Sequence, residues 1–163
     1  MKIATIFTLI SLLGILPTQA QAEDFFQPHE MSLDLHGFYA SRDKGGKDTD
    51  AWGYGAGFNY FFTQNLGVGA DTYCDAFTVP YMINTSVFYR YPLQDANFAP
   101  YGFAGFGRQW DHEARWHGYF GGGVEYRWKP SMGFFGDVRW VVPTEGTSYA
   151  VLRFGFRLVL GRR

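Results

Sequence analysis

The stretch from Trp52 to Phe62 decides the fold and reads Trp52-Gly-Tyr-Gly-Ala-Gly-Phe-Asn-Tyr-Phe-Phe62. Every second residue, counted from Trp52, is aromatic or alanine, and the residues between them are mostly glycine. Successive side chains of a β-strand point to opposite faces, whereas a helix repeats every 3.6 residues. This alternation therefore predicts a strand with one apolar face and one small or polar face.

The same period of two recurs along the rest of the chain, and no 3.6-residue apolar stripe persists after residue 30. Mostly apolar residues alternate with glycine, polar or charged residues in 66–72, 81–91 and 150–160. These repeats predict eight strands of about ten residues, the length that crosses a bilayer when tilted. The expected strands are 31–41, 51–62, 66–76, 81–91, 100–110, 116–128, 132–142 and 148–160. For 100–110 the pattern does not assign the two faces.

The connections between these strands alternate in character. Residues 63–65 and 129–131 are tight turns, and 92–99 is a longer turn on the same side. The polar, glycine-bearing stretch 42–50 and the short stretches 111–115 and 143–147 are loops on the other side. Such alternation is typical of neighbouring antiparallel strands in an up-and-down meander.

The first 22 residues are typical of a secretory signal peptide. Met1-Lys2 is followed by an almost wholly apolar run, 3–16, and by the small-residue sequence Ala20-Gln21-Ala22. A positive start, a short apolar segment and an A-x-A site define such a peptide, and a spanning helix needs a longer run. We expect cleavage after Ala22, which leaves 23–163 as one domain. The net charge of −1 argues against a nucleic-acid partner.

Two all-β architectures fit these strands, a soluble sandwich and a membrane barrel. The apolar face is large, aromatic and present on nearly every strand, whereas the opposite face mixes glycine with charge. Lipid-facing apolar residues that alternate with lumen-facing polar ones are the pattern of a transmembrane barrel. Tyrosine and tryptophan near the strand ends suit the membrane interface. The sequence thus predicts an eight-stranded antiparallel transmembrane β-barrel in the bacterial outer membrane.

Two hairpins and the last strand resemble the OmpA/OmpX-type small outer-membrane barrels of Gram-negative bacteria. The hairpins are Tyr60-Phe-Phe-Thr-Gln-Asn-Leu-Gly-Val-Gly69 and Gly121-Gly-Gly-Val-Glu-Tyr-Arg-Trp-Lys-Pro-Ser-Met-Gly-Phe-Phe-Gly-Asp-Val-Arg-Trp140. The last strand resembles the signal that the barrel-assembly machinery reads, with Arg153, Gly155, Leu158 and Leu160 in the signal positions. Leu160 stands where the family usually has an aromatic residue. The resemblance implies insertion by that machinery and outer-membrane lipid as surroundings.

Alternation also predicts which charged residues face the lumen. They comprise Asp34, Asp71, Asp75, Glu125 and Asp137, together with Arg90, Arg127, Arg139, Arg153 and Arg157, and His36 is expected on the same face. Eight strands leave an interior just wide enough for side chains, and unpaired buried charge costs several kcal/mol. We therefore expect a plugged, ion-paired lumen. An ion path is the alternative.

Catalytic chemistry has weaker support. His112 stands between Asp111 and Glu113, with His117 and Ser148 expected near the same loop side. A histidine beside acids can act as a base or hold a metal, but this spacing matches no known motif, including those of lipid-modifying barrels. A solvated loop is the simpler interpretation. Cys74 is expected as a small side chain on a strand face, and nothing indicates a cofactor.

These observations favour a non-enzymatic integral outer-membrane protein that contributes to envelope structure or surface contact. A small ion-conducting channel is the alternative, and a lipid-modifying enzyme is a weaker one. The sequence does not name a ligand or an oligomeric state.

Overall fold

A computed structural model describes residues 25–41, 43–44, 47–48, 50–75, 81–93, 96–110 and 114–161. The expected signal peptide, 1–22, lies outside these residues. The described strands are β1 (Glu30–Ser41), β2 (Asp43–Lys44), β3 (Lys47–Asp48), β4 (Ala51–Phe61), β5 (Leu66–Asp75), β6 (Tyr81–Arg90), β7 (Phe98–Trp110), β8 (Ala114–Lys129), β9 (Met132–Pro143) and β10 (Tyr149–Gly161).

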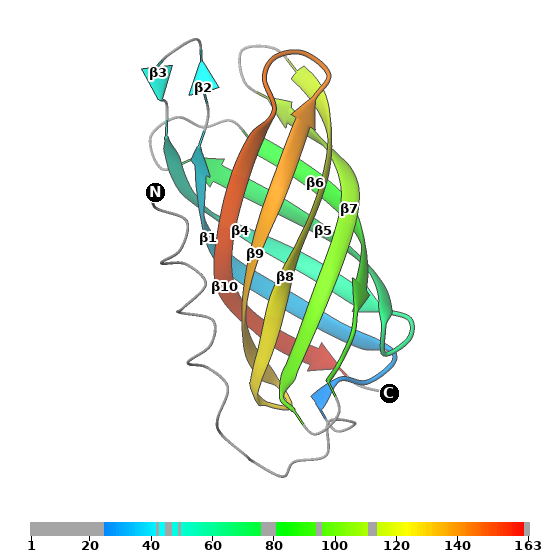
Figure 1. The fold of residues 1–163 in the computed structure, drawn as a ribbon. Helices are drawn as coiled ribbons and strands as arrows, with labels where there is room; N and C mark the ends of the chain where they lie inside the picture. The colour runs from blue at the N-terminus through cyan, green and yellow to red at the C-terminus, as the bar shows by residue number, and fades with distance from the viewer. Residues whose placement is uncertain are drawn as a thin grey trace.

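Eight of these strands form a closed barrel in the order β1-β10-β9-β8-β7-β6-β5-β4, and β2 pairs with β3 apart from it (Figure 1). Every neighbouring pair is antiparallel. The first and last strands close the cylinder, with Leu33 opposite Leu158 and Ala40 opposite Val151. Closure leaves no sheet edge with unpaired backbone groups, which a bilayer does not tolerate. The predicted eight-stranded up-and-down barrel is confirmed.

The strands β7 and β8 depart most from the expected bounds, because both begin two residues earlier than the sequence suggested. The strand expected to begin at residue 100 begins at Phe98, because Phe98 and Ala99 already pair with Tyr126 and Glu125 of β8. At the other end of this hairpin, Ala114 pairs with Trp110, so β8 also starts earlier than expected.

The two ends of the barrel differ. The turn end carries the connections 62–65, 91–97 and 130–131, together with the start of β1 and the end of β10 (Figure 1). The loop end carries the β2–β3 hairpin and the connection 144–148. Outer-membrane barrels have short periplasmic turns and longer external loops. In that orientation the turn end faces the periplasm.

The outer wall is apolar, as the alternation predicted. On β10, Phe154 is 58% exposed whereas Val151 is 5% exposed. The two faces of β7, which the sequence did not assign, place Tyr101 and Phe103 inside and Phe106 outside. Among the described residues, no helix has the length and apolar character to cross a membrane.

Inward glycines make room for the large side chains of neighbouring strands. His36 is opposite Gly55 of β4 on one side and Gly155 of β10 on the other. A Cβ atom at Gly155 would lie 2.7 Å from the Cβ of His36 and 2.8 Å from Cε1 of Phe135. Real Cβ atoms do not approach so closely. Position 155 therefore needs a glycine, because the side chains of His36 and Phe135 lie over it on the inward face of the barrel.

The outward face predicts a depth-dependent cost for charge. Val138 and Val142 both face outward on β9, at mid-strand and near the loop end respectively. Val138→Arg should lower the free energy of unfolding by about 2–4 kcal/mol, and Val142→Arg by about 0–1 kcal/mol, because arginine is costliest at mid-membrane. Urea titration of the refolded variants in lipid vesicles measures both. Equal losses would contradict the placement of β9 across a bilayer.

Candidate functional site: a charge-paired barrel interior

The charged side chains expected inside the barrel lie there, with one position undetermined. Nine of the ten acids and arginines are at most 8% exposed, and His36 is 5% exposed. The side chain of Asp75 lies outside the described part of the structure. The buried charged residues form two separate groups along the barrel axis.

The turn-side cluster consists of Glu30, Asp34, Glu125, Arg90, Arg127 and Arg157. Arg157 donates two hydrogen bonds to Asp34, from Nε at 2.7 Å and from Nη2 at 2.6 Å, and a third to Glu125. Arg127 also donates to Glu125, and it reaches Glu30 at 2.6 Å. Three carboxylates thus face three guanidinium groups.

Glu30 is a member of this cluster that the sequence analysis missed. It is fully buried, and its Oε1 accepts hydrogen bonds from Arg127 and, at 2.9 Å, from Arg90. The expected strand began at residue 31, one residue too late. Glu30 has the same parity as Asp34 and His36, so extending the strand by one residue would have found it.

The central cluster consists of Asp71, Asp137, Arg139 and Arg153. Arg153 binds Asp137 through two parallel hydrogen bonds, from Nε at 2.8 Å and from Nη2 at 2.7 Å. Arg139 donates to both oxygens of Asp71 at 3.3 and 2.8 Å, and Arg153 also reaches Asp71 at 3.3 Å. Bidentate pairs of this kind are strong and fix geometry. This cluster is electrically balanced as well, two against two.

Neutral side chains complete both clusters. Tyr101 donates to Asp137 at 2.7 Å, Asn84 donates to Asp71 at 2.7 Å, and Asn59 donates to Asp34 at 2.9 Å. Each of these carboxylate oxygens also accepts a hydrogen bond from an arginine, so the neutral side chains add further donors, which reduces the cost of burying the charge.

Aromatic rings cover the arginines. The guanidinium carbon of Arg139 lies 4.1 Å from the ring centre of Tyr119, and that of Arg90 lies 3.7 Å from Phe61. At the turn end, the fully buried ring of Phe26 lies about equally close to Arg90 and Arg127, at 5.0 and 5.1 Å. Phe26 precedes β1, so the chain closes the barrel mouth with its own N-terminal segment.

Two histidines lie inside the barrel. His117 lies near the loop end of β8, as expected, but it points into the barrel and is not part of a solvated loop: it is 4% exposed, and its Nε2 lies 2.8 Å from Oδ1 of Asn84. Its parity with Glu125 and Arg127 places it on the inward face of the expected strand 116–128. His36 packs edge-on against Tyr73, with 5.1 Å between ring centres, and neither ring nitrogen has a hydrogen-bond partner among the described residues. Asp111, His112 and Glu113 lie outside the described part of the chain.

The interior histidines are not arranged for nucleophilic catalysis. A nucleophilic serine needs a histidine as its hydrogen-bond partner. The Ser86 hydroxyl instead lies 2.6 Å from the Tyr119 hydroxyl, and the His117 ring is hydrogen-bonded to Asn84. Both histidines are at most 5% exposed, so a substrate has no access to their rings. In the part of the chain that the structure describes, no three His, Cys, Asp or Glu residues are grouped to hold a metal. Cys74 is half-buried on β5 with a free thiol.

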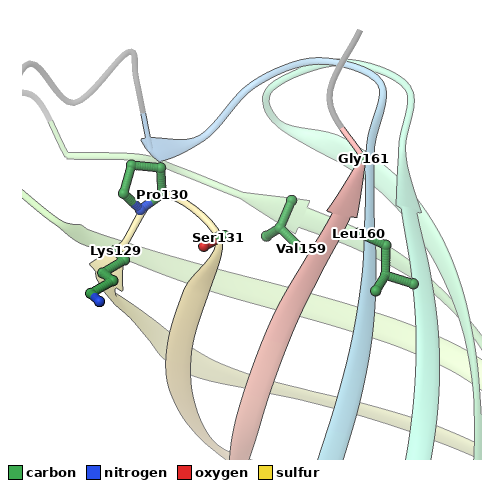
Figure 2. Close-up of a pocket in the computed structure, with 6 residues that line it drawn as sticks. All are labelled: Lys129, Pro130, Ser131, Val159, Leu160 and Gly161. Atoms are coloured by element: carbon green, nitrogen blue, oxygen red, sulfur yellow. The ribbon is translucent and has the colours of Figure 1, made fainter.

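A surface groove lies at the turn end, between the β8–β9 turn and the end of β10 (Figure 2). It is lined by Lys129, Pro130, Ser131, Val159, Leu160 and Gly161. The Val159 amide donates to the carbonyl of Ser131 at 2.9 Å, which ties the turn to β10. The lining is mostly apolar and contains no acid or histidine.

The four residues of the expected assembly signal lie on β10 in two orientations. Arg153 is buried in the central cluster, and Gly155 supports the His36 contact. Leu160 is 60% exposed near the turn end, and Leu158 shares its outward parity. Arg153 and Gly155 therefore have structural tasks whether or not they also serve as a signal.

Comparisons with known proteins define the fold. No protein-family model matches the chain, and no curated protein matches it. Among solved structures, Neisserial surface protein A is similar with a TM-score of 0.66 at 14% identity, over 80% of this chain and 97% of that one. Ail of Yersinia pestis is similar with a TM-score of 0.62 at 12% identity, over 82% and 99%.

A de novo designed transmembrane β-barrel is similar to the same degree, with a TM-score of 0.64 at 14% identity over 82% of this chain and 98% of that one. The chain thus has the fold of the small eight-stranded transmembrane β-barrels. A designed sequence shares this fold with natural outer-membrane proteins, so the fold alone does not determine what the protein does.

The Asp137–Arg153 pair should be strongly coupled. Asp137→Asn or Arg153→Met should each lower the free energy of unfolding by about 3–5 kcal/mol, because each leaves a buried charge without its partner. The double variant should lose clearly less than the sum of the two. Urea unfolding in vesicles measures the cycle, with exposed Glu145→Gln as the control that should change little. Strict additivity would show that the pair is solvated.

Proposed function

We propose that the protein is an integral outer-membrane β-barrel with a sealed lumen, non-enzymatic, which contributes to envelope structure or surface contact. The observation that carries this proposal is the electroneutral filling of the interior. Five arginines and five carboxylates bind one another across the lumen, and aromatic rings occupy the space around them. Little room is left for a substrate or a solute.

The exterior supports membrane placement. Large apolar side chains are exposed on all eight barrel strands, among them Leu35, Val87, Phe120 and Phe154. Exposed tryptophans and tyrosines lie near strand ends, for example Trp52 and Trp140 near the loop end and Tyr89 and Trp128 near the turn end. A soluble protein would not present an apolar surface of this extent to water.

Insertion by the barrel-assembly machinery is part of the proposal. Within the expected signal, Leu158 and Leu160 are the residues that the machinery would contact. Both face outward on the last strand, where a partner can reach them without opening the interior. The signal peptide and cleavage after Ala22 belong to the same export route and stay predictions.

A signal role for Leu160 can be separated from its contribution to folding. Leu160→Asp should lower the amount of protein in the outer membrane of cells but leave refolding in detergent nearly unchanged. Leu66→Asp is the matched control, since Leu66 is another exposed leucine near the turn end, on a strand that carries no signal. Quantitative blots of membrane fractions measure the effect. Equal losses for the two variants would remove the special role of Leu160.

Conductance tests the sealed lumen against the channel alternative. Purified wild-type protein in planar bilayers should be silent, because the eight-stranded interior is filled. Glu125→Ala removes a carboxylate shared by Arg127 and Arg157, and openings should then appear. Frequent, stable openings of the wild type would reject the sealed lumen and favour a channel. Val142→Ala, on the outer wall, should remain silent.

A further inference from the structure

Arg108 stands apart from the arginines of the interior. The five interior arginines each bind a carboxylate, whereas Arg108 makes no ion pair with any described acid. It lies on the outward face of β7, and its Nε is buried without a hydrogen-bond partner among the described residues. A partly buried guanidinium without a counter-charge is costly, so its surroundings must provide one.

Two tryptophans flank Arg108. Its guanidinium carbon lies 5.4 Å from the ring centre of Trp110, two residues along β7, and 5.4 Å from that of Trp116, its direct partner on β8. Both tryptophans are about half-exposed, at 40% and 51%. The carbonyl of Trp116 accepts hydrogen bonds at 3.0 Å from both the amide and the hydroxyl of Thr144, which ties this part of the wall to the β9–β10 loop.

The position of the trio is interfacial. Arg108 is two residues from the loop end of β7, which for a tilted strand is about 5 Å below the rim. Its partner on the other side is Ile83, which is 49% exposed on the outer wall. Apolar side chains thus surround the cation on the sheet, and no acid among the described residues balances it. At this depth an anion of the bilayer can reach it.

We propose that Arg108, held between Trp110 and Trp116, binds the phosphate of a lipid headgroup in the leaflet around the loop end. The inference rests on the proposed membrane placement. Tryptophan favours the depth at which headgroups begin, and arginine presents a fork of donors that matches phosphate in a bidentate way. A lipid phosphate meets the guanidinium at that depth without leaving the bilayer.

The chain offers a matched control at its other end. Lys129, exposed at the turn end, lies with its amine 5.1 Å from the ring centre of Trp128, which is 57% exposed. This pair has a cation and one tryptophan, but it lacks the second ring and the fork of donors. A phosphate site specific to Arg108 predicts that Lys129 can be neutralised without loss of binding.

Phosphatidic acid and diacylglycerol with the same acyl chains differ by the phosphate and are the probes. Protein refolded in phosphate-free dodecyl maltoside micelles is titrated with each lipid, and native mass spectrometry measures the bound fraction. Wild type and Lys129→Gln should bind phosphatidic acid alike, and Arg108→Gln about tenfold or more weakly. Arg108→Lys, which keeps the charge but loses the fork, should fall between them. Diacylglycerol should bind weakly to every variant.

Several results would overturn the site. These are equal binding by Arg108→Gln and wild type, equal binding of the two lipids, or loss of binding in Lys129→Gln. Displacement of phosphatidic acid by inorganic phosphate at similar concentration would replace a lipid site with a free-anion site. The gel mobility of the unboiled protein shows first that each variant is folded. Failure of the wild type to fold in micelles would reject the membrane placement itself, which is distinguishable from a folded barrel without phosphate preference.

Discussion

Charge neutrality inside a narrow lumen is the constraint on which the rest of this structure depends. An eight-stranded barrel leaves no aqueous bore, so each inward arginine needs a carboxylate within reach. Asp34 is directly opposite Arg157, and Asp137 is directly opposite Arg153, across β1–β10 and β9–β10. A slip of one residue would turn these side chains toward lipid. The ion pairs therefore fix the register of the strands that close the barrel.

Inward glycines are the counterpart of these long side chains. Gly57 is opposite Asp34, Gly121 is opposite Arg139, and Gly133 is opposite Arg157 on the neighbouring strands. The guanidinium and carboxylate groups reach the axis by lying over wall positions that carry no side chain. The glycine-rich face of the chain is thus a packing device for the charge clusters, and the same face would be too crowded with any larger residue.

The sequence predicted the face of nearly every strand, because alternation between lipid and lumen is a local property. It did not predict which acid binds which arginine, since that depends on pairing between strands far apart in the chain, such as Arg157 with Asp34. It left β7 unassigned, because glycine and alanine stand on both of its faces. Glu30 was missed for a different reason: the end of a strand is set by pairing with a neighbouring strand, which local composition does not reveal.

A filled lumen moves the question of function to the outer surface. Inside the barrel, carboxylates of the protein balance the charge of each described arginine, so the interior needs no ligand for charge balance. On the outer wall the residues meet lipid, headgroups or solvent, and there a cation such as Arg108 is balanced by whatever surrounds it. A designed barrel shares the wall and the closure, so neither feature distinguishes one such protein from another. The features that distinguish this chain are therefore expected at the two ends of the barrel, where charged side chains such as Arg108 and Lys129 lie beside tryptophans at the border of the apolar surface.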